Sequence, residues 1–254
     1  MSDFPASIDL KVERAVEHLL QLNQECDRFT KGETYTPSID DACLDVTRIY
    51  VLAHHPPRER ISVIVGDVVH NLRSALDHTV WHLGDPSDPR SCFPIFETED
   101  GFKRRGLGVL RGVADKTIEV IRDHQPFLLK EGPKRHPLWL LHLLSNVDKH
   151  RKLGAVASYS VAPGAALRER TGELVTLPIS INQGLLHDGD EIARFPVSRA
   201  EAARRELDLE IQGATMVSLS EAEEWANRPL PGALKEVLLY VRDRVIPDLR
   251  QSLA

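Results

Sequence analysis

Residues 58–83 read RERISVIVGDVVHNLRSALDHTVWHL, and this stretch decides the fold. Apolar residues recur along it at the spacing of one helical face, while the opposite face carries short polar side chains. Pro56 and Pro57 precede the stretch, and Gly84 and Pro86 follow it, as expected at the two ends of a helix. At 1.5 Å per residue the predicted helix is about 39 Å long. We therefore predict a long central helix around which a bundle is built.

The polar face of this helix is unusual in composition. It contains the run HNLRSALDH, residues 70–78, which has neither Lys nor Glu. Asn, Ser, Asp and His are mediocre helix formers because their side chains compete for backbone hydrogen bonds, so a face that only meets solvent would favour Glu, Lys, Gln or Arg. We interpret the face as a site, with these candidate residues: Asp67, His70, Asn71, Arg73, Asp77 and His78.

A second polar run, HLLSNVDKHR, occupies residues 142–151 of a helix predicted from Pro137 to Leu153. Its candidate site residues are Asn146, Asp148, Lys149, His150 and Arg151. On a helical wheel, Asn146, His150 and Arg151 fall on or beside the apolar side, which predicts that they are partly buried. Buried polar groups need hydrogen-bond partners, and the polar groups of the first run are the obvious ones. A single interhelical network that fixes the register of the bundle explains both runs as well as a functional site does.

The rest of the chain predicts an α+β protein. Residues 1–153 are expected to form the helical bundle that carries both polar runs, residues 154–219 a β-rich antiparallel region, and residues 220–254 a C-terminal helix that packs back on the bundle. Further elements are expected at these places: helices at 7–28, 99–105, 115–124 and 232–249, and a strand at 43–53.

Composition limits the class of protein. Of 254 residues, 42% are hydrophobic and 28% charged, which is ordinary for a globular domain, and the net charge is -6. No apolar run approaches membrane-spanning length and no secretion signal is recognisable at the N-terminus, so we expect a cytoplasmic protein without a membrane partner. The three cysteines are far apart and odd in number, which argues against disulfides.

Positive charge is concentrated in one segment. Residues 101–152 contain twelve Lys or Arg and five Asp or Glu, although the whole chain is acidic. This excess predicts either a local anion-binding surface or charges distributed over several solvated faces.

The histidine spacing bears on metal binding. His70 and His78 are eight residues apart, and so are His142 and His150, so the two members of each pair lie about 12 Å apart along one helix. That separation is too long for a shared metal ion. We therefore assign no metal ligand and no cofactor, and a metal site would need one histidine from each helix.

The Arg-x4-His spacing of Arg73 and His78 resembles that of HEPN-domain ribonucleases, which are also helical bundles. Over residues 57–153 the two polar runs together resemble an uncharacterised bacterial family. The HEPN resemblance implies a metal-independent endoribonuclease or an RNA-binding relative, with RNA, a second copy of the chain and an antitoxin-like protein as partners. It also implies that His78 exchanges a proton with the ribose 2′-hydroxyl and that Arg73 stabilises the phosphate in the transition state.

Two other function classes remain open. Arg73 stands four residues before Asp77, so an ordinary ion pair along the helix is a competing explanation for the arginine. A non-enzymatic ligand-binding or assembly protein with a structural polar network is the alternative function. A metal-dependent hydrolase is the third.

Overall fold

The computed structural model describes residues 4–31, 35–40, 47–53, 57–161, 166–169, 174–175, 180–181, 189–204, 207–210, 213–225 and 228–253. Helices and antiparallel strands together make it a helix-rich α+β protein. The chain folds into two compact units: Met1–Glu25, Glu59–Gly154 and Leu219–Ala254 form the first, while Cys26–Arg58 and Ala155–Ser218 form the second. Residues 26–58 thus belong to a different unit from the bundle segment in which the sequence analysis placed them.

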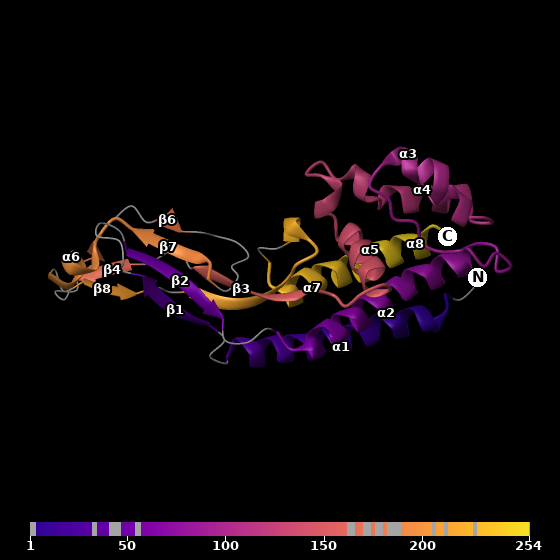
Figure 1. Ribbon diagram of the computed structural model, residues 1–254. Helices are drawn as coiled ribbons and strands as arrows, with labels where there is room; N and C mark the ends of the chain where they lie inside the picture. Colours follow the sequence, from indigo (N-terminus) through magenta and orange to yellow (C-terminus); the bar gives the residue numbers. More distant parts are fainter. Residues whose placement is uncertain are drawn as a thin grey trace. The chain divides into compact units, whose positions relative to one another are not determined.

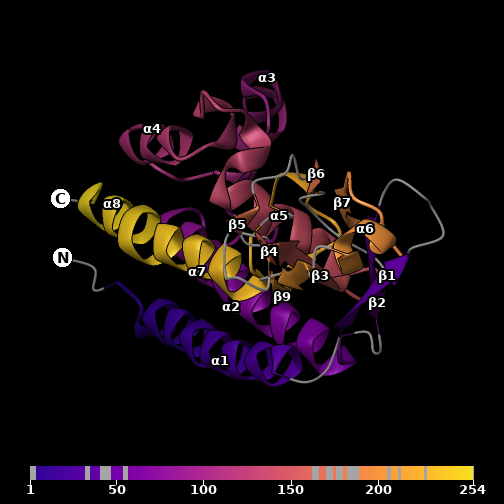
Figure 2. The same ribbon diagram turned by 90° about the vertical axis from the view of Figure 1, so that its left-hand side faces the viewer.

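The first unit is helical, and α2 (Glu59–Leu83) is one of its two longest helices. Figures 1 and 2 both show α1 (Ala6–Thr30) running alongside α2. The remaining helices of this unit are α3 (Glu99–Gly101), α4 (Asp115–Asp123), α5 (Pro137–Asp148), α7 (Leu230–Tyr240) and α8 (Ile246–Gln251), with the π-helices η1 (Phe102–Gly106) and η6 (Val241–Val245) and the 3-10 turns η2 (Leu107–Val109), η3 (Pro126–Leu128), η4 (Pro133–Arg135) and η5 (Glu223–Trp225).

The core of this unit forms where the apolar face of α2 meets α5 and α8. Along α2, Val65, Leu72 and Leu76 are fully buried, and each such side chain stabilises the fold by about 1.5–3 kcal/mol. The C-terminal helices contribute a matching apolar stripe that packs on α2 and α5. It consists of Leu234, Val237, Leu238, Val241, Val245 and Leu249.

Two π-helical segments interrupt the helical geometry, and each has a local reason. In η6 the N–H of Ile246 donates to the carbonyl of Val241, five residues back, directly before Pro247. Proline has no N–H and clashes with the carbonyl four residues before it, so one wider turn lets the helix continue through Pro247. In η1 the N–H of Leu107 donates to Phe102, and the segment ends at Gly106, which lies against the rings of Phe96 and Phe102. Wide turns of this kind occur frequently at functional sites.

The second unit contains the strands. One sheet has the antiparallel order β1 (Tyr35–Asp40), β2 (Thr47–Ala53), β7 (Glu191–Phe195), β6 (Ser180–Ile181), with a bulge between Ile49 and Tyr50. Strands β5 (Leu174–Val175), β4 (Ala166–Glu169) and β8 (Leu207–Glu210) form another antiparallel sheet. Strand β3 (Ala155–Val161) pairs with β9 (Gly213–Leu219), and α6 (Arg199–Arg204) precedes β8. Residues 43–46 of the strand predicted at 43–53 lie outside the described residues, and so do several residues of the β-rich region predicted at 154–219, among them 176–179 and 211.

One predicted boundary is wrong: the helix that starts at Pro137 ends at Asp148 rather than at Leu153. The helix predicted at 99–105 is confirmed as a helical segment, in which α3 is followed directly by the π-helix η1. The described helices include none with both the length and the apolar character needed to cross a membrane.

The N-terminus of α5 depends on a histidine. The Nδ1 atom of His136 accepts a hydrogen bond of 3.1 Å from the N–H of Leu138, so His136 caps the helix. Burial, with a smaller contribution from the nearby His124, lowers the pKa of His136 to about 4. Protonation of Nδ1 removes the acceptor of the cap.

We expect this cap to make stability pH-dependent. The folded-state pKa of His136 lies below the ordinary value of about 6.5, so its contribution is complete above about pH 6.5 and decreases as the pH falls toward 4. The loss should be on the order of 3 kcal/mol. Urea unfolding between pH 7 and pH 4.5 measures it. In His136→Asn, which keeps a capping side chain without an ionisable group, the slope of stability against pH should flatten; an unchanged slope would contradict the assignment.

Candidate functional site

Arg73 and Asp77 of α2 form an ion pair that holds a neighbouring segment of backbone. The guanidinium donates from Nε to Oδ2 of Asp77 at 3.1 Å, and Nη2 lies 3.0 Å from Oδ1. Nη2 also donates to the carbonyl of Phe93 at 2.7 Å, and the N–H of Phe93 donates to Oδ1 of Asp77 at 2.8 Å. The pair therefore satisfies both backbone groups of Phe93. This confirms the ion pair that the sequence analysis offered as the competing explanation for Arg73.

Gln125 holds the next residues of the same segment. Its Oε1 accepts from the N–H of Phe96 at 3.0 Å, and its Nε2 donates to the carbonyl of Pro94 at 2.8 Å. Residues 91–96 have no regular secondary structure, so their backbone groups need partners from elsewhere. Arg73, Asp77 and Gln125 supply those partners, and the path of the segment is fixed by side chains on both sides of it.

The held segment forms one wall of a pocket of about 560 Å³, called here the Arg73 pocket. Its lining is Arg73, Cys92–Thr98, Arg105, Val109 and His142. Arg105 comes from the π-helix η1, and its guanidinium carbon lies 5.2 Å from the centre of the Phe96 ring. Apolar walls with a few charged groups and a volume of several hundred Å³ are typical of small-molecule sites.

The charges that act on His142 in this pocket are mainly positive. His142, in α5, accepts at Nε2 from the amide of Asn146 at 3.0 Å. Burial lowers the pKa of His142, and the charges of Arg73 and Lys149 lower it further, against a smaller opposing effect of Glu97. Glu97 itself accepts a hydrogen bond of 2.7 Å from the indole of Trp139. His142 is therefore neutral at pH 7 beside cationic groups.

Cys92 is unsuited to nucleophilic chemistry in this setting. Burial raises the pKa of its thiol, and the nearby guanidinium of Arg73 opposes that effect only in part. The thiolate is the reactive form of cysteine. At neutral pH Cys92 is a protonated, half-buried side chain of the pocket wall.

The other candidates on α2 do not converge with Arg73. His78 is exposed and forms no hydrogen bond or ion pair with any described residue, so the structure does not join the predicted catalytic pair. Asn71 is buried and donates to the carbonyl of Asp67 in its own helix at 2.8 Å. The carboxylate of Asp67 lies 3.9 Å from His18 of α1, while exposed His70 lies 3.5 Å from Ser74.

The candidate residues of the second polar run also do not gather in one site. Helices α2 and α5 pack together, so closely that a Cβ added to Gly66 would lie 2.7 Å from a carboxylate oxygen of Asp148. The predicted burial of Asn146, His150 and Arg151 is wrong, because all three are exposed. The wheel placed His150 and Arg151 in helical phase, but α5 ends at Asp148 and both lie beyond it. Within the described ranges, neither of them forms a side-chain hydrogen bond or an ion pair.

Among the described residues, no three His, Cys, Asp or Glu side chains lie close enough together to bind a metal ion.

Several residues of the pocket were not predicted from the sequence. Gln125, Glu97 and Arg105 lie outside both polar runs, and the segment Phe93–Phe96 reads as a connection. The signals present were local: an apolar Phe-Pro-Ile-Phe tetrapeptide between two polar stretches, and a glutamine directly before Pro126.

The chain matches no protein-family model, no curated protein and no solved structure. Function is accordingly inferred from the chemistry of its own residues.

Replacing Arg73 tests whether the Arg73–Asp77 pair is structural. Arg73→Ala removes the partner of a part-buried carboxylate and of the Phe93 carbonyl, and should lower the free energy of unfolding by about 2–3 kcal/mol. Arg151→Ala is the matched control, because Arg151 is exposed and its side chain has no partner among the described residues. Chemical denaturation compares them, and equal stability of the two variants would show that the pair does not hold the Phe93 segment.

Proposed function

We propose that this protein binds a small anionic molecule with an apolar body in the Arg73 pocket, with α2 as the central helix that carries the site. The observation that carries the proposal is the fixed pocket wall, in which side chains from α2 and the end of α4 satisfy the backbone of Phe93, Pro94 and Phe96. A wall held in this way loses little conformational entropy when a ligand binds, which favours affinity.

The lining defines the chemistry of the ligand. Phe93, Ile95, Phe96 and Val109 offer apolar surface, while Arg105 and the field of Arg73 and Lys149 favour negative charge. A carboxylate or phosphate attached to an aromatic or aliphatic group satisfies both requirements. This corresponds to the ligand-binding alternative of the sequence analysis.

Probes that match in size but differ in charge test this proposal. Benzoate and phenyl phosphate should bind the purified protein, whereas benzamide, which has the size of benzoate without its charge, should bind more weakly. Arg105→Gln should lower the affinity for the anions by about tenfold, as expected for loss of one charge-assisted hydrogen bond. Isothermal titration calorimetry gives the affinities.

The neighbouring arginine supplies the control. Arg104 is in the same π-helix but is 77% exposed, pairs with Asp100 and does not line the pocket. Arg104→Gln should bind the anions like the wild type. Equal binding of benzoate and benzamide, or equal losses in the two arginine variants, would count against an anion site.

A metal-independent ribonuclease is the second candidate, and one observation favours it. His78 is exposed on α2 and has no hydrogen-bond or ion-pair partner among the described residues, as expected of a residue that meets an external substrate. Arg73 is bound to Asp77 and Phe93, so it is less suited to the role that the HEPN resemblance gives it. A cytoplasmic location, a homodimer and an antitoxin-like partner belong to this candidate.

Cleavage assays with labelled single-stranded and structured RNA decide between the candidates. If His78 transfers a proton, His78→Ala should lower the cleavage rate by about a hundredfold or more while leaving the melting temperature unchanged. EDTA should have no effect. Absence of cleavage by the wild-type protein would leave ligand binding as the function, and loss of cleavage in EDTA would favour a metal-dependent hydrolase.

A further inference from the structure

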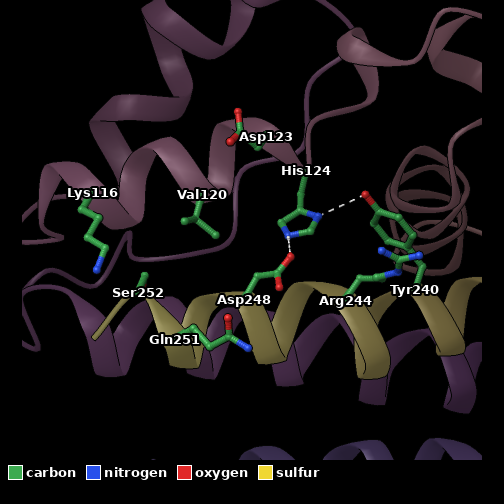
Figure 3. A pocket seen from close by; sticks show the side chains of 9 residues that line it. All are labelled: Lys116, Val120, Asp123, His124, Tyr240, Arg244, Asp248, Gln251 and Ser252. Atoms are coloured by element: carbon green, nitrogen blue, oxygen red, sulfur yellow. Dashed lines mark hydrogen bonds and ion pairs between the residues drawn. The ribbon is translucent and has the colours of Figure 1, made fainter. Parts of the chain in front are cut away.

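A chain of hydrogen bonds links four side chains of the first unit, none of which lines the Arg73 pocket. Figure 3 shows three of them, Asp248, His124 and Tyr240. The carboxylate of Asp248 lies 3.0 Å from Nε2 of His124, and Nδ1 of His124 lies 3.1 Å from the hydroxyl of Tyr240. That hydroxyl lies 3.2 Å from Nε2 of His136. The two histidines of this hydrogen-bond chain, His124 and His136, are buried, with 8% and 6% of their surface exposed.

The donor and acceptor of each of these hydrogen bonds follow from His136, the buried residue at one end of the series. Nδ1 of His136 accepts from the N–H of Leu138, so the neutral ring carries its proton on Nε2 and donates to the oxygen of Tyr240. The Tyr240 hydroxyl then donates its own proton to Nδ1 of His124, whose Nε2–H donates to Asp248. Hydroxyl to imidazole to carboxylate is the order found in Ser-His-Asp enzymes.

Three members of this hydrogen-bond chain, Asp248, His124 and Tyr240, line a pocket of about 700 Å³, called here the His124 pocket. The pocket lies between α4 and the C-terminal helices. Lys116 and Asp123 of α4, Arg244 of η6, and Gln251 and Ser252 also line it (Figure 3). Thr117 and Ser252, whose hydroxyls are 2.9 Å apart, join the two sides.

The pocket lining contains two cations, Lys116 and Arg244, and two carboxylates, Asp123 and Asp248. Lys116 and Arg244 form no ion pair or side-chain hydrogen bond with any described residue, so both ammonium and guanidinium are available to phosphate oxygens. The carboxylate of Asp248 is held by His124, which leaves Asp123 as the unpaired acid of the lining. The π-helix η6 supplies Arg244 from the wide turn between Tyr240 and Asp248.

We propose that the His124 pocket is a catalytic site for phosphate esters, in which Tyr240 is the nucleophile, His124 its general base and Asp248 the residue that orients His124. The Tyr240 oxygen donates one hydrogen bond and accepts one from His136, so it retains a lone pair for attack. A nucleophile within reach of a base that a third group holds in place is the arrangement of covalent catalysis.

The reaction balances in two steps. In the first, the Tyr240 oxygen bonds to phosphorus as the bond from phosphorus to the ester oxygen breaks, and the phenolic proton moves to His124 and from there to the leaving alkoxide. In the second, water attacks the phosphotyrosine, its proton moves to His124, and the tyrosine oxygen leaves and recovers that proton. A monoester gives an alcohol and inorganic phosphate, and a diester gives an alcohol and a phosphate monoester.

The ionisation of the groups agrees with these roles. Burial lowers the pKa of His124, partly offset by Asp248, so the ring is neutral and able to accept a proton at pH 7. Burial also raises the pKa of Tyr240. The phenol therefore stays protonated until attack, which is why it needs a base in contact.

Hydrolysis of p-nitrophenyl phosphate and bis(p-nitrophenyl) phosphate by the purified full chain tests the proposal and separates monoesters from diesters. The wild type should release p-nitrophenolate from at least one of them. Tyr240→Phe and Asp248→Asn should each lower the rate by about a hundredfold or more, and Tyr50→Phe in the second unit should not. Acid-quenched wild-type protein should carry a phosphoryl group on the peptide that contains Tyr240.

Four results would overturn it: no release from either phosphate ester, release from p-nitrophenyl acetate alone, a wild-type rate in folded Tyr240→Phe, or a phosphoryl group on another residue. Circular dichroism verifies that the variants fold. Asp248 is 48% exposed, so Asp248→Asn keeps the test valid if Tyr240→Phe does not fold. A negative result here leaves the proposed anion binding untouched, because the two pockets share no lining residue.

Discussion

The pairing of Arg73 with Asp77 is the interaction on which the first pocket depends. Two charged side chains one helical turn apart normally contribute only a few tenths of a kcal/mol. Here they are part-buried, and they bind both backbone groups of Phe93, which has no strand or helix to satisfy them. Through this pair, the regular helix α2 holds the irregular segment around Phe93 in place. With Gln125 on the other side, it fixes a wall that regular secondary structure does not provide.

Each of the two pockets is lined in part by an arginine from a π-helical turn. In the Arg73 pocket, η1 supplies Arg105, and in the His124 pocket, η6 supplies Arg244. A wider turn changes the direction of the side chains that follow it relative to an ideal α-helix. In η6 this turn lies between Tyr240 and Asp248, both of which meet His124. The stability of the helix and the geometry of the pocket are linked by the same local irregularity, which Pro247 imposes.

Histidines carry out different tasks in this protein because their surroundings differ. His78 is exposed on α2, whereas His136 is buried, caps α5 and donates to Tyr240. His142 is neutral beside cations in the Arg73 pocket, and His124 joins a carboxylate to a phenol. Burial lowers the pKa of His124, His136 and His142, so each is neutral at pH 7 and works by hydrogen bonding or proton transfer rather than by charge.

The sequence by itself determined the helix-rich α+β class, the extent of α2 and its apolar face, because helical periodicity and flanking Pro and Gly are local signals. It also indicated Arg73 and Asp77 as a pair, because four residues separate them on one helix. Only the tertiary structure decided what that pair holds, that α5 ends before His150, and that His124, Tyr240, His136 and Asp248 meet. These four residues come from two segments, 124–136 and 240–248, that are more than a hundred positions apart in the chain, and no local pattern links the two segments. Packing of distant helices brings them together, and packing depends on the whole chain.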